Sequence, residues 1–137
     1  MRLRGEAARL ETRRDFSEVE VTRDDSLRVR LAGRPRALAW HLEAAAERRD
    51  GDDYRGSAPW LATHTPEYVE SVTADRRFVN HPLLRKYYLA DRERRAARLG
   101  LQWAGSETLT AGFAANWQRD EYADQSALGL TATRGMT

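Results

Sequence analysis

The chain has 137 residues, of which 41% are hydrophobic and 32% are charged, with a net charge of +2 at pH 7. This size and composition predict one soluble globular domain and exclude a wholly disordered chain. The absence of cysteine excludes disulfides, thiolate metal sites and a cysteine nucleophile. No apolar run reaches the roughly 18 residues of a transmembrane helix, and residues 1–5 lack the apolar core of a secretory signal. We therefore expect a protein of the cytoplasm, or of an assembled particle, with no membrane contact.

The N-terminal part carries an alternating pattern on both sides of residues 23–25. Residues 17–22 and 26–31 alternate apolar with polar side chains, which is the period of a half-buried strand. Pairing the two segments as an antiparallel hairpin places the apolar side chains on one face and opposite charges on the other, which stabilises this register. Residues 1–15 are left open between a helix and a third strand. The predicted pairs are Val21 with Leu27, Val19 with Val29, Glu20 with Arg28, and Glu18 with Arg30.

The rest of the chain is expected to be helical. Apolar side chains recur at spacings of three and four in residues 38–49, after Pro35. Thr65 and Pro66 have the types of an N-cap and a first helical residue. Two further helices are expected at residues 82–99 and 106–122. The predicted fold class is therefore α+β, with an N-terminal antiparallel β-hairpin, or three strands, packed against three or four α-helices.

We expect a single domain over residues 1–137. Its parts are a hairpin–helix half at 1–57 and a helical half at 58–124, followed by a polar tail at 125–137. The glycine-bearing acidic segment 50–57 would join the two halves. The tail is expected to be extended or to await a partner.

Residues 84–100, LRKYYLADRERRAARLG, contain six basic side chains and two adjacent tyrosines. On a helix the tyrosines would fall on the apolar side, whereas side chains that stack on nucleic-acid bases would lie among the basic ones. We therefore interpret the segment first as a solvated helix, whose basic side chains remain available to an acidic protein or a phosphate-rich partner. The candidate contact residues are Arg85, Lys86, Arg92, Arg94, Arg95 and Arg98.

The sequence offers little for catalysis. It lacks the HExxH, GxSxG, GxxxxGK[ST] and GxGxxG patterns, so we expect neither a metal nor a cofactor. If the chain were an enzyme, His64 and His81 would be the acid–base candidates, with Glu67 or Asp75 as an orienting carboxylate.

We interpret the chain as a non-catalytic structural or assembly component of a larger complex. Trp60 and Trp103 fall in expected connections and are candidate anchors of an interface with other protein subunits, in a homo- or hetero-oligomer. Every basic residue except Lys86 is arginine, which is typical of a GC-rich genome, and a phage particle is one home for such a chain. Two alternatives are an arginine-rich nucleic-acid-binding accessory and a small metal-independent enzyme using His64 and His81.

Overall fold

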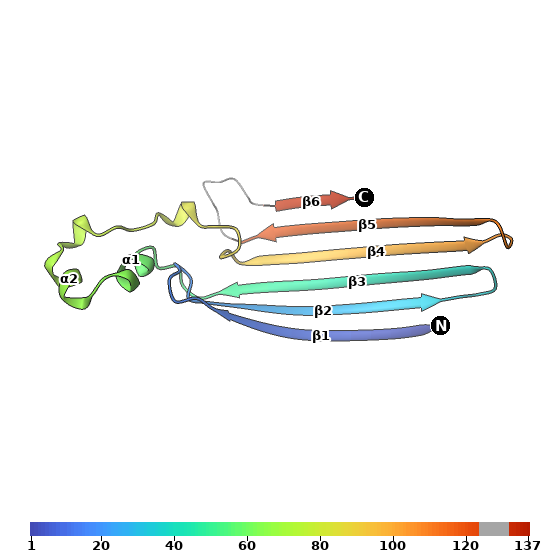
Figure 1. Cartoon of the computed structure of the whole chain (residues 1–137), viewed down its shortest axis with the longest axis horizontal. Helices are drawn as coiled ribbons and strands as arrows, with labels where there is room; N and C mark the ends of the chain where they lie inside the picture. The colour runs from blue at the N-terminus through green and yellow to red at the C-terminus, as the bar shows by residue number, and fades with distance from the viewer. Residues whose placement is uncertain (124–131) are drawn as a thin grey trace.

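The computed structural model describes residues 1–123 and 132–137, and within them the chain forms one six-stranded antiparallel sheet (Figure 1). The strands lie side by side in the order in which they occur along the chain. Their bounds are β1 (Arg2–Arg13), β2 (Val21–Gly33), β3 (Leu38–Gly51), β4 (Arg92–Ala104), β5 (Thr110–Tyr122) and β6 (Ala132–Met136).

The connection between β3 and β4 projects beyond one end of the sheet (Figure 1). It contains the short helices α1 (Ala58–Thr63) and α2 (Pro66–Ser71) and the single 3-10 turns η1 (Ala74–Arg76) and η2 (Pro82–Leu84). We call this end of the sheet the loop end, and the opposite end, with the tight connections 34–37 and 105–109, the turn end.

This architecture shows that the expected α+β fold is wrong. The segments expected as three long helices, at 38–49, 82–99 and 106–122, form most of β3, β4 and β5. Alanine explains much of the error, because it is compatible with either period. In residues 38–46 the apolar side chains fit a helical stripe, but Leu38, Trp40 and Leu42 also alternate with a period of two.

The expected hairpin is also wrong, because β2 runs straight through residues 23–25. Arg9 donates to Asp25 across the β1–β2 pair at 2.6 Å, and Arg49 donates to Asp24 across the β2–β3 pair at 2.8 Å. Cross-strand arginines thus satisfy carboxylates that would favour a turn in isolation. The alternation in residues 26–31 is real, but its partners lie elsewhere: Leu27 faces Ala7 on β1 and Ala46 on β3.

Other expectations have mixed outcomes. Residues 1–15, left open, supply β1. The helix start at Thr65 and Pro66 is confirmed, since the Thr65 hydroxyl accepts a hydrogen bond from the Tyr68 N–H at 3.4 Å. Pro82 opens only one 3-10 turn. The tail expected at 125–137 lies partly outside the described residues, and its last part contains β6. The single-domain expectation stays a prediction.

The small core lies at the loop end rather than under the sheet. Val19 in the β1–β2 connection and Leu89 in the segment before β4 are 0% and 1% exposed, and both residues lie next to Gly51 at the end of β3. The Asn80 amide donates to the buried Glu18 carboxylate at 2.5 Å. Among the described residues, no element covers either face of the sheet, and large apolar side chains such as Phe113 remain 57% exposed.

Candidate functional site

One face of the sheet is a continuous apolar surface. Residues directly opposite each other in an antiparallel register share a face, so the pairing defines rows across the strands. One such row runs from Leu3 through Leu31, Leu42 and Leu99 to Ala115. The surface, called the apolar face below, consists of Leu3, Gly5, Ala7, Leu27, Val29, Leu31, Gly33, Leu38, Trp40, Leu42, Ala44, Ala46, Ala97, Leu99, Leu101, Trp103, Ala111, Phe113, Ala115, Trp117 and Met136.

The two borders of the apolar face differ. Towards the turn end it is aromatic, with Trp40, Trp103 and Phe113 close to the tight connections. Towards the loop end the same side of the sheet becomes charged, starting at Arg95 and Arg119 and continuing one row further out. The apolar face is therefore a band with an aromatic border at one end and an ionic border at the other.

The opposite side, called the polar face below, alternates with the apolar face along every strand. It carries arginines, carboxylates and amides separated by small side chains. Its polar members are Arg2, Arg4, Glu6, Thr12, Thr22, Asp24, Ser26, Arg28, Arg30, His41, Glu43, Glu47, Arg49, Arg92, Arg94, Arg98, Gln102, Thr110, Asn116, Gln118, Asp120, Tyr122 and Thr133.

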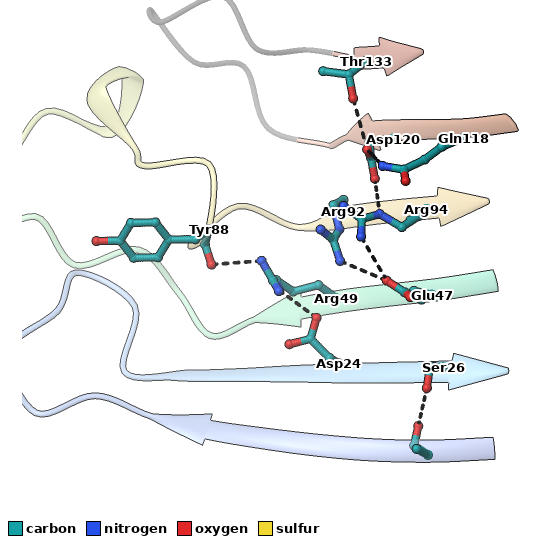
Figure 2. Close-up of polar contacts among 11 residues, drawn as sticks. Asp24, Ser26, Glu47, Arg49, Tyr88, Arg92, Arg94, Gln118, Asp120 and Thr133 are labelled. Atoms are coloured by element: carbon teal, nitrogen blue, oxygen red, sulfur yellow. Dashed lines mark hydrogen bonds and ion pairs between the residues drawn. The ribbon is translucent and has the colours of Figure 1, made fainter. Parts of the chain in front are cut away.

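Ion pairs and hydrogen bonds cross the polar face near the loop end (Figure 2). One pair joins β2 to β3, and a separate connected set joins β3 to β4, β5 and β6. Asp120, which is 3% exposed, lies at its β5–β6 end and accepts hydrogen bonds from Arg94, Gln118 and Thr133. Cross-strand pairs of this kind fix the register of neighbouring strands. The contacts of this ionic ladder are Arg49–Asp24 at 2.8 Å, Arg92–Glu47 at 3.3 Å, Arg94–Glu47 at 3.7 Å, Arg94–Asp120 at 2.6 Å, Gln118–Asp120 at 2.7 Å and Thr133–Asp120 at 3.1 Å.

Towards the turn end the polar face is dominated by arginine. Arg28 and Arg98 share Glu43, at 3.6 and 3.9 Å, and among the described residues Arg2 and Arg30 have no ion pair. A hollow of about 590 Å³ here is lined by basic and neutral residues, with no carboxylate among them. His41 lies in this hollow opposite Gly100, where a Cβ atom would clash with the imidazole, so the glycine makes room for the ring.

The six basic residues expected to form one contact surface are divided by the fold. A strand sends successive side chains to opposite sides, so Arg92, Arg94 and Arg98 lie on the polar face and Arg95 lies on the other side. Arg85 and Lys86 belong to the connection before β4, where the Arg85 guanidinium lies 4.8 Å from the centre of the Tyr54 ring. Burial raises the pKa of Tyr54, with a smaller contribution from the charge of Glu18. The role of these six residues in binding a partner stays a prediction.

The two candidate histidines occupy local structures in the β3–β4 connection. The His64 ring contacts both Trp60 and Tyr68, with ring centres 4.6 and 5.0 Å away, and these two rings lie 6.3 Å from each other, so the three form a cluster. His64 Nδ1 lies 2.7 Å from the Trp60 carbonyl oxygen. His81 Nδ1 accepts a hydrogen bond from the Leu83 N–H at 3.2 Å. Nearby, hydrogen bonds with its own backbone and Thr65 lower the pKa of Glu67. In the described part of the chain no cluster of histidine and carboxylate side chains could hold a metal.

The expected interface tryptophans are also far apart in the fold. Trp60 belongs to α1, whereas Trp103 belongs to β4 and to the aromatic border of the apolar face. Their role as anchors of a subunit interface stays a prediction. No described helix has the length and apolarity needed to cross a membrane.

Strands that alternate between one apolar and one polar face, with nothing among the described residues covering the apolar one, have the pattern typical of transmembrane β-barrel walls. The comparison with protein families agrees with this pattern. The family model described as "Putative outer membrane beta-barrel porin, MtrB/PioB" matches residues 1–137, and the chain belongs to this family. Searches of curated proteins and of solved structures found no match.

Membership in this family corrects the functional expectations. The expected structural or assembly component, with a phage particle as one home, and the alternative of a nucleic-acid-binding accessory are both wrong, because the family is one of outer-membrane porins. The expected cytoplasmic or particle location and the expected lack of membrane contact are wrong for the same reason. The expectation that the chain is not an enzyme is confirmed, because porins are a non-enzymatic class.

Proposed function

We propose that the chain forms part of the wall of an outer-membrane β-barrel pore. The apolar face contacts lipid acyl chains, and the polar face contacts a water-filled lumen. The observation that carries this proposal is the division of the strands into one apolar and one polar side, from the turn end as far as the row of Ala97 and Trp117. Burial of apolar surface stabilises a protein by roughly 25 cal/mol per Å², and contact with hydrocarbon supplies this burial for a band that nothing in the described chain covers.

Strand length supports the proposal. A tilted β-strand needs about 9–11 residues to cross a bilayer. Strands β1 to β5 have 12 to 14 residues, so each can cross and extend beyond the hydrocarbon. The charged row at the loop end then lies at the lipid headgroups, and the aromatic border at the turn end has the place of an interfacial girdle.

The sheet must be continued by further strands. In hydrocarbon every backbone N–H and C=O group needs a partner, so an open sheet edge is not tolerated there. The outer edges of β1 and β6 have no partner strand among the described residues, and known barrels of this type begin at about eight strands. We infer that these six strands form one segment of a larger barrel wall.

The lengths of the connections orient the wall. Barrels of this type have short turns on the periplasmic side and longer loops on the extracellular side. The tight connections 34–37 and 105–109 share one end of the sheet, and the connections 14–20 and 52–91 share the other. The loop end therefore faces the cell exterior.

An epitope inserted after Asp75, in the 52–91 connection, should bind antibody on intact cells. The same epitope inserted after Arg34, in the β2–β3 turn, should bind antibody only after the outer membrane is permeabilised. Flow cytometry of the two strains measures both. Labelling of the Arg34 insertion alone on intact cells would contradict the orientation, and an equal response of both insertions before and after permeabilisation would contradict membrane insertion.

A further inference from the structure

Three arginines lie directly opposite one another at the border of the apolar face. Arg95 on β4 is paired in register with Arg119 on β5, and Arg119 is paired with Arg134 on β6. The next row towards the turn end is apolar, with Ala97 and Trp117. Like charges placed directly opposite each other destabilise a sheet. Negative charge close to these three arginines, called the outer arginine row below, would offset this repulsion.

The chain itself supplies only part of that charge. The Arg95 guanidinium lies 3.6 Å from the Glu93 carboxylate, and Arg119 pairs with Glu121. The side chains of Arg95 and Arg119 are 69% and 44% exposed, and exposed pairs of this kind contribute little. Arg134 is exposed and has no ion pair among the described residues. Guanidinium N–H groups of the outer arginine row are therefore free to bind a further anion.

A groove on the same side of the sheet begins at Arg95. It has a volume of about 670 Å³ and runs across β1 to β4 between the last apolar row and the first fully charged row. Ala7, Leu27 and Ala46 line its apolar edge, and Arg95 closes that edge at β4. Its charged edge is made by Arg9, Asp25, Arg48 and Glu93.

The arginines that line the groove differ in how closely they are already paired with carboxylates. Asp25 accepts two hydrogen bonds from Arg9, at 2.6 and 2.9 Å, and Arg48 lies 3.0 Å from Asp50. Arg95 is held more loosely than either of these arginines, by one contact of 3.6 Å. The groove thus has an apolar side, and at one end it is lined by Arg95, which is also the first member of the outer arginine row.

We propose that the outer arginine row and this groove bind the phosphorylated headgroup of a lipid in the outer leaflet. Guanidinium groups bind phosphate through paired charge-assisted hydrogen bonds, and the charge of a bound phosphate would neutralise the outer arginine row. Basic sites beside transmembrane segments recognise lipid headgroups in this way. The acyl chains of the same lipid then lie along the apolar face. This inference rests on the proposed function, because the headgroup meets the row only if the sheet crosses the membrane with its loop end outside.

The test uses the purified full-length protein and bisphosphorylated lipid A, compared with the same lipid after removal of its phosphates. Native mass spectrometry of a titration gives the two dissociation constants. We expect the phosphorylated lipid to bind about tenfold more tightly. The triple variant Arg95→Gln, Arg119→Gln, Arg134→Gln should reduce this preference to about twofold or less. If that variant does not fold, Arg134→Gln alone should still lower the preference, because Arg134 is exposed on the last strand.

The matched control removes three arginines from the other side of the sheet. The variant Arg2→Gln, Arg4→Gln, Arg30→Gln makes the same change in net charge on the polar face and should keep the full preference. An equal loss in this control, no preference in the wild-type protein, or competition by millimolar inorganic phosphate as strong as that by the lipid would each overturn the proposal. Epitope labelling separates this failure from failure of the proposed function, because the orientation can hold while the lipid preference is absent.

Discussion

Replacing Leu99 by arginine should destabilise the membrane-inserted protein by about 2–4 kcal/mol. Leu99 lies near the middle of the apolar face, between Leu42 and Ala115 in register. A guanidinium at this position would enter hydrocarbon without a partner, and the cost of an outward-facing charge is greatest at the bilayer midplane. Urea-induced unfolding from phosphatidylcholine vesicles, followed by the fluorescence of the four tryptophans, gives the change in unfolding free energy.

Gln102→Arg is the matched control for this substitution. Gln102 lies on the same strand but on the polar face, where a new arginine meets water, so its effect should stay within about 1 kcal/mol. Equal losses in the two variants, or a larger loss for Gln102→Arg, would contradict the assignment of the two faces.

Replacing Asp120 by asparagine should lower the free energy of unfolding by about 2–3 kcal/mol. The carboxylate is almost fully buried and accepts hydrogen bonds from three side chains. Its loss leaves Arg94 with Glu47 alone, at 3.7 Å, and places an amide N–H among donors. Breaking a buried ion pair costs about 3–5 kcal/mol, and the 30% exposure of the Arg94 side chain reduces that figure.

The same unfolding experiment measures this loss. Because Thr133 on β6 donates to Asp120, the variant should also make β6 more sensitive to protease. Glu121→Gln is the control, since it removes a half-exposed carboxylate from the same strand and should change stability by less than about 1 kcal/mol. A loss for Asp120→Asn no greater than that for Glu121→Gln would show that the ionic ladder does not stabilise the sheet.

The alternation of apolar and polar residues indicates the strands, but this alternation is clear only in parts of the sequence. In β2 the order Leu27, Arg28, Val29, Arg30, Leu31 can be recognised as a strand, and the side of each residue is right. In β4 the loop-end half places arginine on both faces, so alternation becomes clear only from Ala97 onwards. Alanine, arginine and glutamate also have high helix propensity, which favoured helices where the sheet pairing decides otherwise.

The candidate site depends on the register, which the sequence alone does not provide. Asp24 and Arg49 are far apart in the chain and meet only because β2 and β3 pair as they do. The arginines of residues 92–98 were recognisable as a basic cluster, but assigning Arg95 and Arg98 to different faces requires a strand rather than a helix. The absence of an enzyme motif, by contrast, could be seen from the sequence directly.

The division into a lipid face and a lumen face can be measured directly, because the natural chain contains no cysteine. Single cysteines replace Arg98, Leu99, Leu101 and Gln102 on β4, and each variant in native outer membranes is treated with a membrane-impermeant maleimide. Cysteines at 98 and 102 should react, whereas those at 99 and 101 should react only after the protein is unfolded. Equal labelling at all four positions, or labelling at 99 and 101 alone, would contradict a sheet with lipid on one side and water on the other.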